Sequence, residues 1–166
     1  FNIGFIRGNI GTRIGKLETE GFDGIILAVA GLKRVGWEDR ISQVLPSDIS
    51  LPAVGQGALG IECREDDAEL IELLQRINDP STRDTVRAER SLLHALDGSC
   101  QVPIAGYAIQ READIELTAL VGMPDGTEVI RQTLAGSEPV QLGRELADVL
   151  LDLGADRILQ KARETQ

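Results

Sequence analysis

The most chemically suggestive stretch of the sequence is residues 98–104 (GSCQVPI), which carries a lone thiol at Cys100. Leucines at helical spacing precede this stretch, and an alternating apolar run that begins at Val102 follows it. Gly98 is free to adopt the left-handed conformation that closes many helices. We therefore expect Cys100 to lie on a short turn between a helix and a strand, two rigid elements that would hold a reactive group in place.

The chemistry of this thiol stays open from local sequence alone. A free cysteine is most often a small buried hydrophobe. A protease-like nucleophile is disfavoured, because the partial negative charge at a helix C-terminus opposes formation of a thiolate. The single histidine, His94, lies six residues upstream, and no third group that would orient it is evident.

Three arginines form a second candidate site. Arg7 and Arg13 flank a glycine-rich turn that follows the first apolar run, and Arg34 lies just past the second apolar run. The glycines match neither G-x-G-x-x-G nor the G-K-[ST] of phosphate loops. In open α/β sheets ligands bind at the carboxyl ends of the strands, so guanidinium groups there, beside helix N-termini, predict a site for a multiply anionic ligand. Three ordinary solvated arginines remain the alternative interpretation.

The first part of the chain has the pattern of an α/β fold. Residues 1–6 and 24–30 are continuous apolar runs, typical of strands buried in a parallel sheet, and a helix is expected after each. Residues 54–63 predict a further strand. The glycines beside Gln56 in that strand indicate close approach of the backbone to a ligand or partner. Cys63, at its end, is expected to pack in the interior.

The second part predicts a helix-covered antiparallel sheet, hence an α+β unit. A capping box at residues 81–84 is expected to open the helix that ends at Leu96. The other elements expected are a helix capped by Asp66 or Asp67 and carrying apolar residues 70–77, strands from residue 102, at 115–121 and at 127–134 with a hairpin turn at 123–126, and helices through 142–153 and 155–163.

Composition excludes several function classes. The 166 residues carry a formal net charge of −10, and residues 41–166 hold eleven basic against twenty-two acidic side chains, which argues against non-specific nucleic-acid binding. Two cysteines without a CxxC pair predict neither a zinc site nor a disulfide framework. No apolar run is long enough to span a membrane, no signal peptide is evident, and a reducing cytoplasm is the expected location. The chain starts with Phe1 inside a strand-like run, so we expect a fragment of a longer polypeptide.

Four motifs in order resemble the porphobilinogen deaminase family, also called hydroxymethylbilane synthase. They are residues 7–13 (RGNIGTR), 28–34 (AVAGLKR), 51–58 (LPAVGQGA) and 98–104. Ser99 stands where the family usually has glycine, a small-for-small change.

The resemblance implies roles for the candidate residues. The family carries a dipyrromethane cofactor on a cysteine through a thioether, and Cys100 matches that position. Arginines of the family bind the acetate and propionate carboxylates of the pyrroles, and a glutamine lies near the cofactor. The residues of this sequence that match the binding motifs are Arg7, Arg13, Arg34, Gln56 and Gly31.

The resemblance also implies a reaction, part of tetrapyrrole and haem biosynthesis. Four porphobilinogen molecules would condense with loss of ammonia, and hydrolysis would release hydroxymethylbilane. Cys100 would serve as an anchor that does not turn over, and no metal is implied. The family's catalytic aspartate belongs to an N-terminal domain that this chain does not contain, so we expect no catalytic residue here and no activity from these residues alone.

The family fold implies three parts. Residues 1–52 would be the later part of a second, periplasmic-binding-protein-like domain with an incomplete open sheet. Residues 53–77 would be a crossover strand and helix of the missing first domain, and residues 78–166 the C-terminal domain with the cofactor cysteine. We expect a cytoplasmic monomer when complete. The competing functions are a non-catalytic carboxylate-binding module, such as the effector domain of a regulator, and, third, a structural or interaction module; neither needs a thiol-linked pyrrole.

Overall fold

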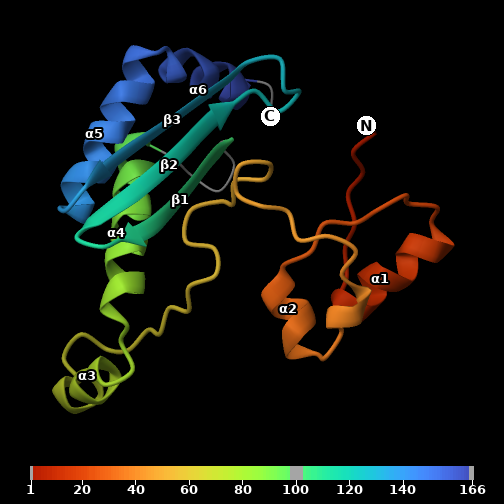
Figure 1. Cartoon of the computed structure of the whole chain (residues 1–166), viewed down its shortest axis with the longest axis horizontal. Helices are drawn as coiled ribbons and strands as arrows, with labels where there is room; N and C mark the ends of the chain where they lie inside the picture. The colour runs from red at the N-terminus through yellow and green to blue at the C-terminus, as the bar shows by residue number, and fades with distance from the viewer. Residues whose placement is uncertain (1, 98–102, 165–166) are drawn as a thin grey trace. The chain divides into compact units, whose positions relative to one another are not determined.

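The computed structural model describes residues 2–97 and 103–164. The chain divides into two compact units, Phe1–Leu45 and Pro46–Gln166. The elements, labelled in Figure 1, are α1 (Ile10–Thr19), α2 (Val29–Arg34), the 3₁₀ helix η1 (Glu38–Arg40), α3 (Ala68–Gln75), α4 (Pro80–Ala95), β1 (Ile104–Arg111), β2 (Asp114–Gly122), β3 (Val129–Gly136), α5 (Pro139–Asp152) and α6 (Ala155–Glu164).

Strands predicted for the first part are not formed among the described residues. Residues 2–6, 24–28 and 58–63 are irregular, residues 54–57 belong to a turn, and Val29 already belongs to α2. The side chains of Phe5 and Ile26 are 100% and 78% exposed. A continuous apolar run becomes a strand only where neighbouring strands accept its hydrogen bonds and cover its faces, and the described residues supply no such neighbours here. The open sheet of the first part therefore stays a prediction.

The second unit contains one antiparallel sheet with the order β1-β2-β3. Ile104 pairs with Val121 at one end of the β1–β2 ladder, and Leu117 pairs with Leu134 between β2 and β3. Figure 1 shows α4 and α5 running behind the sheet, with α6 beside them. This arrangement confirms the predicted three-stranded sheet covered by helices.

The core of this unit lies between the helices and one face of the sheet. Alternate residues of β2 are fully buried, as the two-residue period of a strand requires. The α4 residue Leu92 and the α5 residues Leu146 and Leu150 are fully buried against them. Each such leucine contributes roughly 1.5–3 kcal/mol of transfer free energy. The unit is thus stabilised by aliphatic packing on one side of the sheet.

The start of α4 differs from the prediction. Asp79, not Ser81, caps this helix: its Oδ1 accepts a hydrogen bond from the Thr82 N–H at 2.7 Å. Pro80 occupies the first turn, where its missing N–H would have had no helical partner. The predicted capping box was wrong because Pro80 fixes the backbone for a helix. The N-cap is therefore Asp79, two positions before Ser81, and Ser81 already lies inside the helix. Asp67 caps α3 as predicted.

Within the described residues, no helix has the length and apolar character that crossing a membrane requires.

Candidate functional site

The three candidate arginines lie in the first unit, at the ends of its two α-helices. Arg7 is exposed and precedes α1, Arg13 is half-buried in the first turn of α1, and Arg34 is the exposed last residue of α2. The expectation that Arg34 would stand beside a helix N-terminus was wrong. Ala28 is already the N-cap of α2, so the helix ends at the residue that was expected near its start.

Arg13 carries an unsatisfied donor. Its Nε is buried and has no hydrogen-bond partner among the described residues. A buried N–H without an acceptor is costly, and on a guanidinium it is an attractive position for an anion. The turn before it is tight: Gly8 has a φ of +125°, and the Asn9 Oδ1 accepts from the Thr12 N–H at 2.8 Å. This turn fixes the first helical residues and hence the stem of Arg13.

Gly31 has a packing role. A β-carbon added there would lie 3.0 Å from Cδ1 of Ile10. The absence of a side chain therefore lets α2 approach the first turn of α1, the turn that also carries Arg13. Gly31 thus serves the packing between these two helices.

Gln56 lies in the second unit, on a turn formed by residues 53–57. Its backbone N–H donates to the Ala53 carbonyl at 3.3 Å, and its side chain is exposed. Gly55 and Gly57 have φ values of +76° and +85°, which side-chain-bearing residues rarely adopt. The strand predicted across these residues is therefore a turn, and this turn presents Gln56 to solvent.

A buried carboxylate holds this turn. Glu89 of α4 is 4% exposed. Its Oε2 accepts from the Gly55 N–H at 2.7 Å and its Oε1 from the Ala108 N–H of β1 at 2.8 Å. Burial raises the pKa of Glu89, while the two N–H groups oppose that rise by favouring the charged form. Glu89 thus links three segments that are distant in sequence.

The chain leading to this turn is also anchored to the sheet. The guanidinium of Arg131 on β3 donates to the Asp48 carbonyl at 2.7 Å and to the Ser47 carbonyl at 3.1 Å. The Gly106 N–H of β1 donates to the Pro52 carbonyl at 3.1 Å. The segment that leads into the Gln56 turn is therefore held to both β3 and β1.

Cys100 lies outside the described residues, so its predicted position on a turn is neither confirmed nor contradicted. The last described residue before it, Asp97, has a φ of +49° and receives a hydrogen bond from Arg163 of α6 to its carbonyl at 2.9 Å. His94 is exposed on α4. Cys63 is also exposed, so the expectation that it packs in the interior was wrong. The segment before it is irregular and pairs with no strand among residues 2–97 and 103–164.

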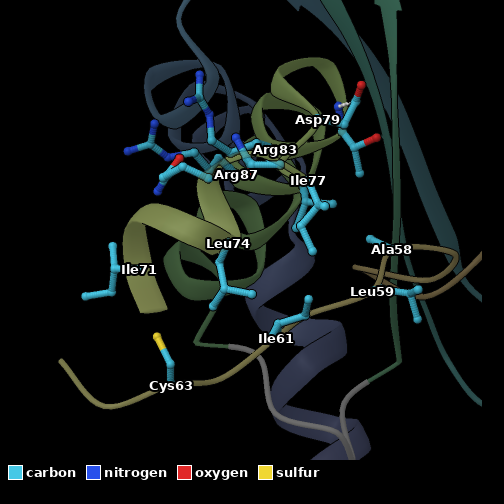
Figure 2. Close-up of a pocket in the computed structure, with 14 residues that line it drawn as sticks. Ala58, Leu59, Ile61, Cys63, Ile71, Leu74, Ile77, Asp79, Arg83 and Arg87 are labelled. Atoms are coloured by element: carbon cyan, nitrogen blue, oxygen red, sulfur yellow. Dashed lines mark hydrogen bonds between the residues drawn. The ribbon is translucent and has the colours of Figure 1, made fainter. Parts of the chain in front are cut away.

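A groove of about 550 Å³ lies in the second unit, lined by residues between Ala58 and Arg87. Its lining is largely aliphatic, including Ile61 and Leu74. In the view of Figure 2, Arg83 and Arg87 lie above Leu74 and the sulfur of Cys63 lies below it. None of the candidate binding residues lines this groove.

Two family descriptions match the chain in sequence order. Residues 1–72 match "Porphobilinogen deaminase, dipyromethane cofactor binding domain", and residues 84–152 match "Porphobilinogen deaminase, C-terminal domain". The chain belongs to the porphobilinogen deaminase family. The candidate residues Arg7, Arg13, Arg34, Gly31 and Gln56 fall inside the first match, and Cys100 falls inside the second.

Curated members of the porphobilinogen deaminase family are similar along nearly the whole chain. The protein named porphobilinogen deaminase from Halalkalibacterium halodurans is 55% identical over 162 residues, 96% of this chain and 52% of that protein. Those from Geobacillus kaustophilus and Oceanobacillus iheyensis are 51% and 52% identical over 163 residues, each match covering 98% of this chain and 53% of the relative. The chain spans about half the length of the curated relatives it matches.

Sequence reasoning did not identify Glu89. One signal was available, because Glu89 precedes Leu92 by three positions and Leu96 by seven, the spacing of one helix face. A charged residue on an otherwise apolar helix face is a candidate for a buried, hydrogen-bonded group. Its partners could not be named in advance, because they are backbone N–H groups of a turn and a strand.

Proposed function

We propose that this chain is part of a porphobilinogen deaminase, which condenses four porphobilinogen molecules with release of ammonia and then of hydroxymethylbilane. Two observations together carry the proposal. The cofactor-binding and C-terminal family descriptions match this chain in sequence order. Relatives named porphobilinogen deaminase are 51–55% identical to it over nearly the whole chain. The product class places the protein in tetrapyrrole biosynthesis.

The arginines of the first unit fit a ligand with several carboxylates. Arg13 offers a buried Nε without a partner among the described residues, and Arg7 and Arg34 are exposed and free to reach a ligand. A guanidinium binds a carboxylate through two parallel N–H bonds, which fixes orientation as well as charge. In this proposal Arg7, Arg13 and Arg34 hold acetate and propionate arms, and Gln56 supplies an amide from its exposed turn.

Cys100 is proposed as the attachment point of the dipyrromethane cofactor through a thioether. When bound, the cofactor supplies the pyrrole from which the product chain grows. Cys100 itself holds that group in place and is not consumed. A helix C-terminus before it, at Leu96, disfavours a free thiolate, which suits a permanent tether better than a turning-over nucleophile.

The proposal assigns the acid–base chemistry to residues outside this chain. The curated relatives are about twice as long, and the proposed catalytic aspartate would belong to their remaining part. The exposure of apolar side chains between residues 53 and 77 supports the proposed domain division: Leu59 is 85% and Ile77 69% exposed. Such side chains are expected to pack against that remaining part. By itself the chain would then be inactive, and the complete enzyme is proposed to be a cytoplasmic monomer.

The decisive experiment is the intact mass of the complete enzyme, either the full polypeptide that carries this chain or a chimaera in which the chain replaces the aligned residues of the Halalkalibacterium halodurans protein. We expect a dipyrromethane adduct in the wild type and in Cys63→Ser, and none in Cys100→Ser. Turnover of porphobilinogen should be lost with the adduct. An adduct on Cys100→Ser would refute the attachment, and a wild type with neither adduct nor turnover would refute the function.

A further inference from the structure

Three segments of the second unit meet at one side chain. The helix α4 precedes residues 98–102, the strand β1 follows them, and the turn at residues 53–57 carries Gln56. Glu89 lies on α4 and accepts hydrogen bonds from the turn at Gly55 and from the strand at Ala108. We propose that Glu89 is a positioning residue of the cofactor site, one that holds Gln56 in fixed relation to both elements flanking Cys100. This inference rests on the proposed function.

The geometry requires two acceptors at one position. The Gly55 N–H and the Ala108 N–H reach different oxygens of Glu89, at 2.7 and 2.8 Å. A carboxylate offers two acceptor oxygens, whereas a glutamine amide offers one oxygen and an N–H₂ that would face the second donor. Glutamate is therefore the side chain of this size that serves both donors at once.

Burying a carboxylate is costly in a core that could be apolar. Well-packed apolar residues often stabilise a protein as much as a buried polar group does, so stability alone does not require Glu89. Hydrogen bonds, in contrast, fix direction and distance. The buried carboxylate defines where the turn sits, to within the tolerance of two short hydrogen bonds.

Packing around Glu89 supports the same function. A β-carbon added at Gly106 would lie 3.1 Å from Leu92 of α4 and 3.1 Å from Val54 of the turn. The bare backbone of Gly106 thus lets the turn and the helix meet beside the strand. The Pro52 carbonyl accepts from the same glycine at 3.1 Å. The turn is therefore seated on β1 and α4, and its Gln56 side chain is exposed to solvent.

The test compares Glu89→Gln with Ser91→Ala in the complete enzyme. Ser91 lies two residues further along α4, and its Oγ donates to the carbonyl of Val140 in α5 at 2.7 Å. Ser91→Ala therefore also removes a side-chain hydrogen bond from α4, but one made to α5 and not to the turn. We expect Glu89→Gln to lower kcat/KM for porphobilinogen about tenfold or more, under conditions where it is fully folded. Ser91→Ala should stay within about twofold of the wild type.

A double-mutant cycle shows whether Glu89 acts through Gln56. If it does, Gln56→Ala combined with Glu89→Gln is no less active than Gln56→Ala alone. A merely structural role predicts instead that the losses of the two single variants multiply. Multiplying losses, or wild-type activity in Glu89→Gln, would overturn the inference.

Amide hydrogen exchange separates this inference from the proposed function. In Glu89→Gln the exchange of the Gly55 N–H should accelerate about tenfold or more relative to Ser91→Ala, whatever the enzyme does. Unchanged exchange at Gly55 would show that the carboxylate does not hold the turn. Faster exchange in a protein without adduct or turnover would keep the link between helix and turn, and would refute its role at a cofactor site together with the proposed function.

Discussion

Glu89 makes the stability of the second unit depend on pH in an unusual direction. Burial raises its pKa above the ordinary value of 4.5, so the folded state holds the proton more tightly than the unfolded chain does. The stabilisation by the protonated group is complete below the unfolded-state pKa and is lost as the pH rises through the raised, folded-state pKa. Most paired carboxylates behave in the opposite way.

We therefore predict that the free energy of unfolding of the wild type falls relative to that of Glu89→Gln as the pH rises from about 4.5 through the folded-state pKa. The slope for one proton is at most about 1.4 kcal/mol per pH unit. Urea unfolding of both proteins at a series of pH values measures the difference, in which the titrations of other carboxylates cancel. A difference that is constant across this range would contradict the raised pKa.

The arginines of the first unit give a second prediction at the same scale. If Arg7, Arg13 and Arg34 bind carboxylates, lysine at each position weakens binding, because an ammonium cannot make two parallel hydrogen bonds. We expect KM for porphobilinogen to rise, or cofactor loading to fall, by about tenfold per position. Arg40→Lys is the matched control, since Arg40 stacks 5.3 Å from the Trp37 ring and a lysine can keep that contact. Full activity in all three test variants would show that these arginines are ordinary solvated surface residues.

At the scale of elements, the crossing of α4 and α5 depends on Gly143. A β-carbon there would lie 2.4 Å from the Ala88 carbonyl oxygen and 2.7 Å from the Leu92 backbone nitrogen. These are backbone atoms, so the helices themselves would have to separate. We expect Gly143→Ala to destabilise the protein by about 1–3 kcal/mol or more, despite the higher helix propensity of alanine.

Gly15→Ala is the contrasting variant for this prediction. Gly15 lies within α1, and a β-carbon there meets nothing within 4 Å. The substitution Gly15→Ala should therefore stabilise α1 by up to about 1 kcal/mol. Thermal unfolding of both variants distinguishes a steric cost from a general effect of replacing a helical glycine, and equal changes of the same sign would contradict the close crossing.

The elements predicted correctly are those whose partners lie nearby in sequence. The strands β1, β2 and β3 are joined by short turns, so alternation and the turn at residues 123–126 were enough to predict three strands of an antiparallel sheet. The apolar runs at residues 2–6 and 24–28 carry no comparable local signal for a partner strand. Their exposure illustrates that a strand forms only where a neighbouring strand is present to pair with it. The sequence of a single apolar run does not show whether such a neighbour exists.

The candidate site was predictable to a similar extent. Motif resemblance selected the arginines and Gln56, but it did not reveal that Gly31 serves the packing of two helices or that Gln56 sits on a turn. Both features depend on contacts with distant residues, Ile10 in one case and Glu89 in the other. Periodicity and motif spacing describe a residue's own segment and carry no information about such contacts.

For the whole molecule, hydrogen exchange of the isolated chain should separate a protected core from an unprotected segment. We expect slow exchange in residues 115–121 and 129–134, which form the ladders of the sheet, and fast exchange in residues 58–67, which are irregular. The amides of Gly55 and Gly106 should be protected, because the first donates to Glu89 at 2.7 Å and the second to the Pro52 carbonyl at 3.1 Å. Uniformly slow exchange from residue 58 to residue 77 would contradict this division.

The contacts that hold the turn against β1 also protect the edge of the sheet from pairing with another molecule. β1 lies at an edge of the sheet, where free N–H groups could recruit a strand from another chain. The Pro52 carbonyl accepts a hydrogen bond from the Gly106 N–H, and Glu89 accepts one from the Ala108 N–H, two residues further along the same strand. The same residues therefore block edge-to-edge association. Any change that releases the turn would uncover a template for oligomers, so loss of function through Glu89 should bring a concentration-dependent tendency to self-associate.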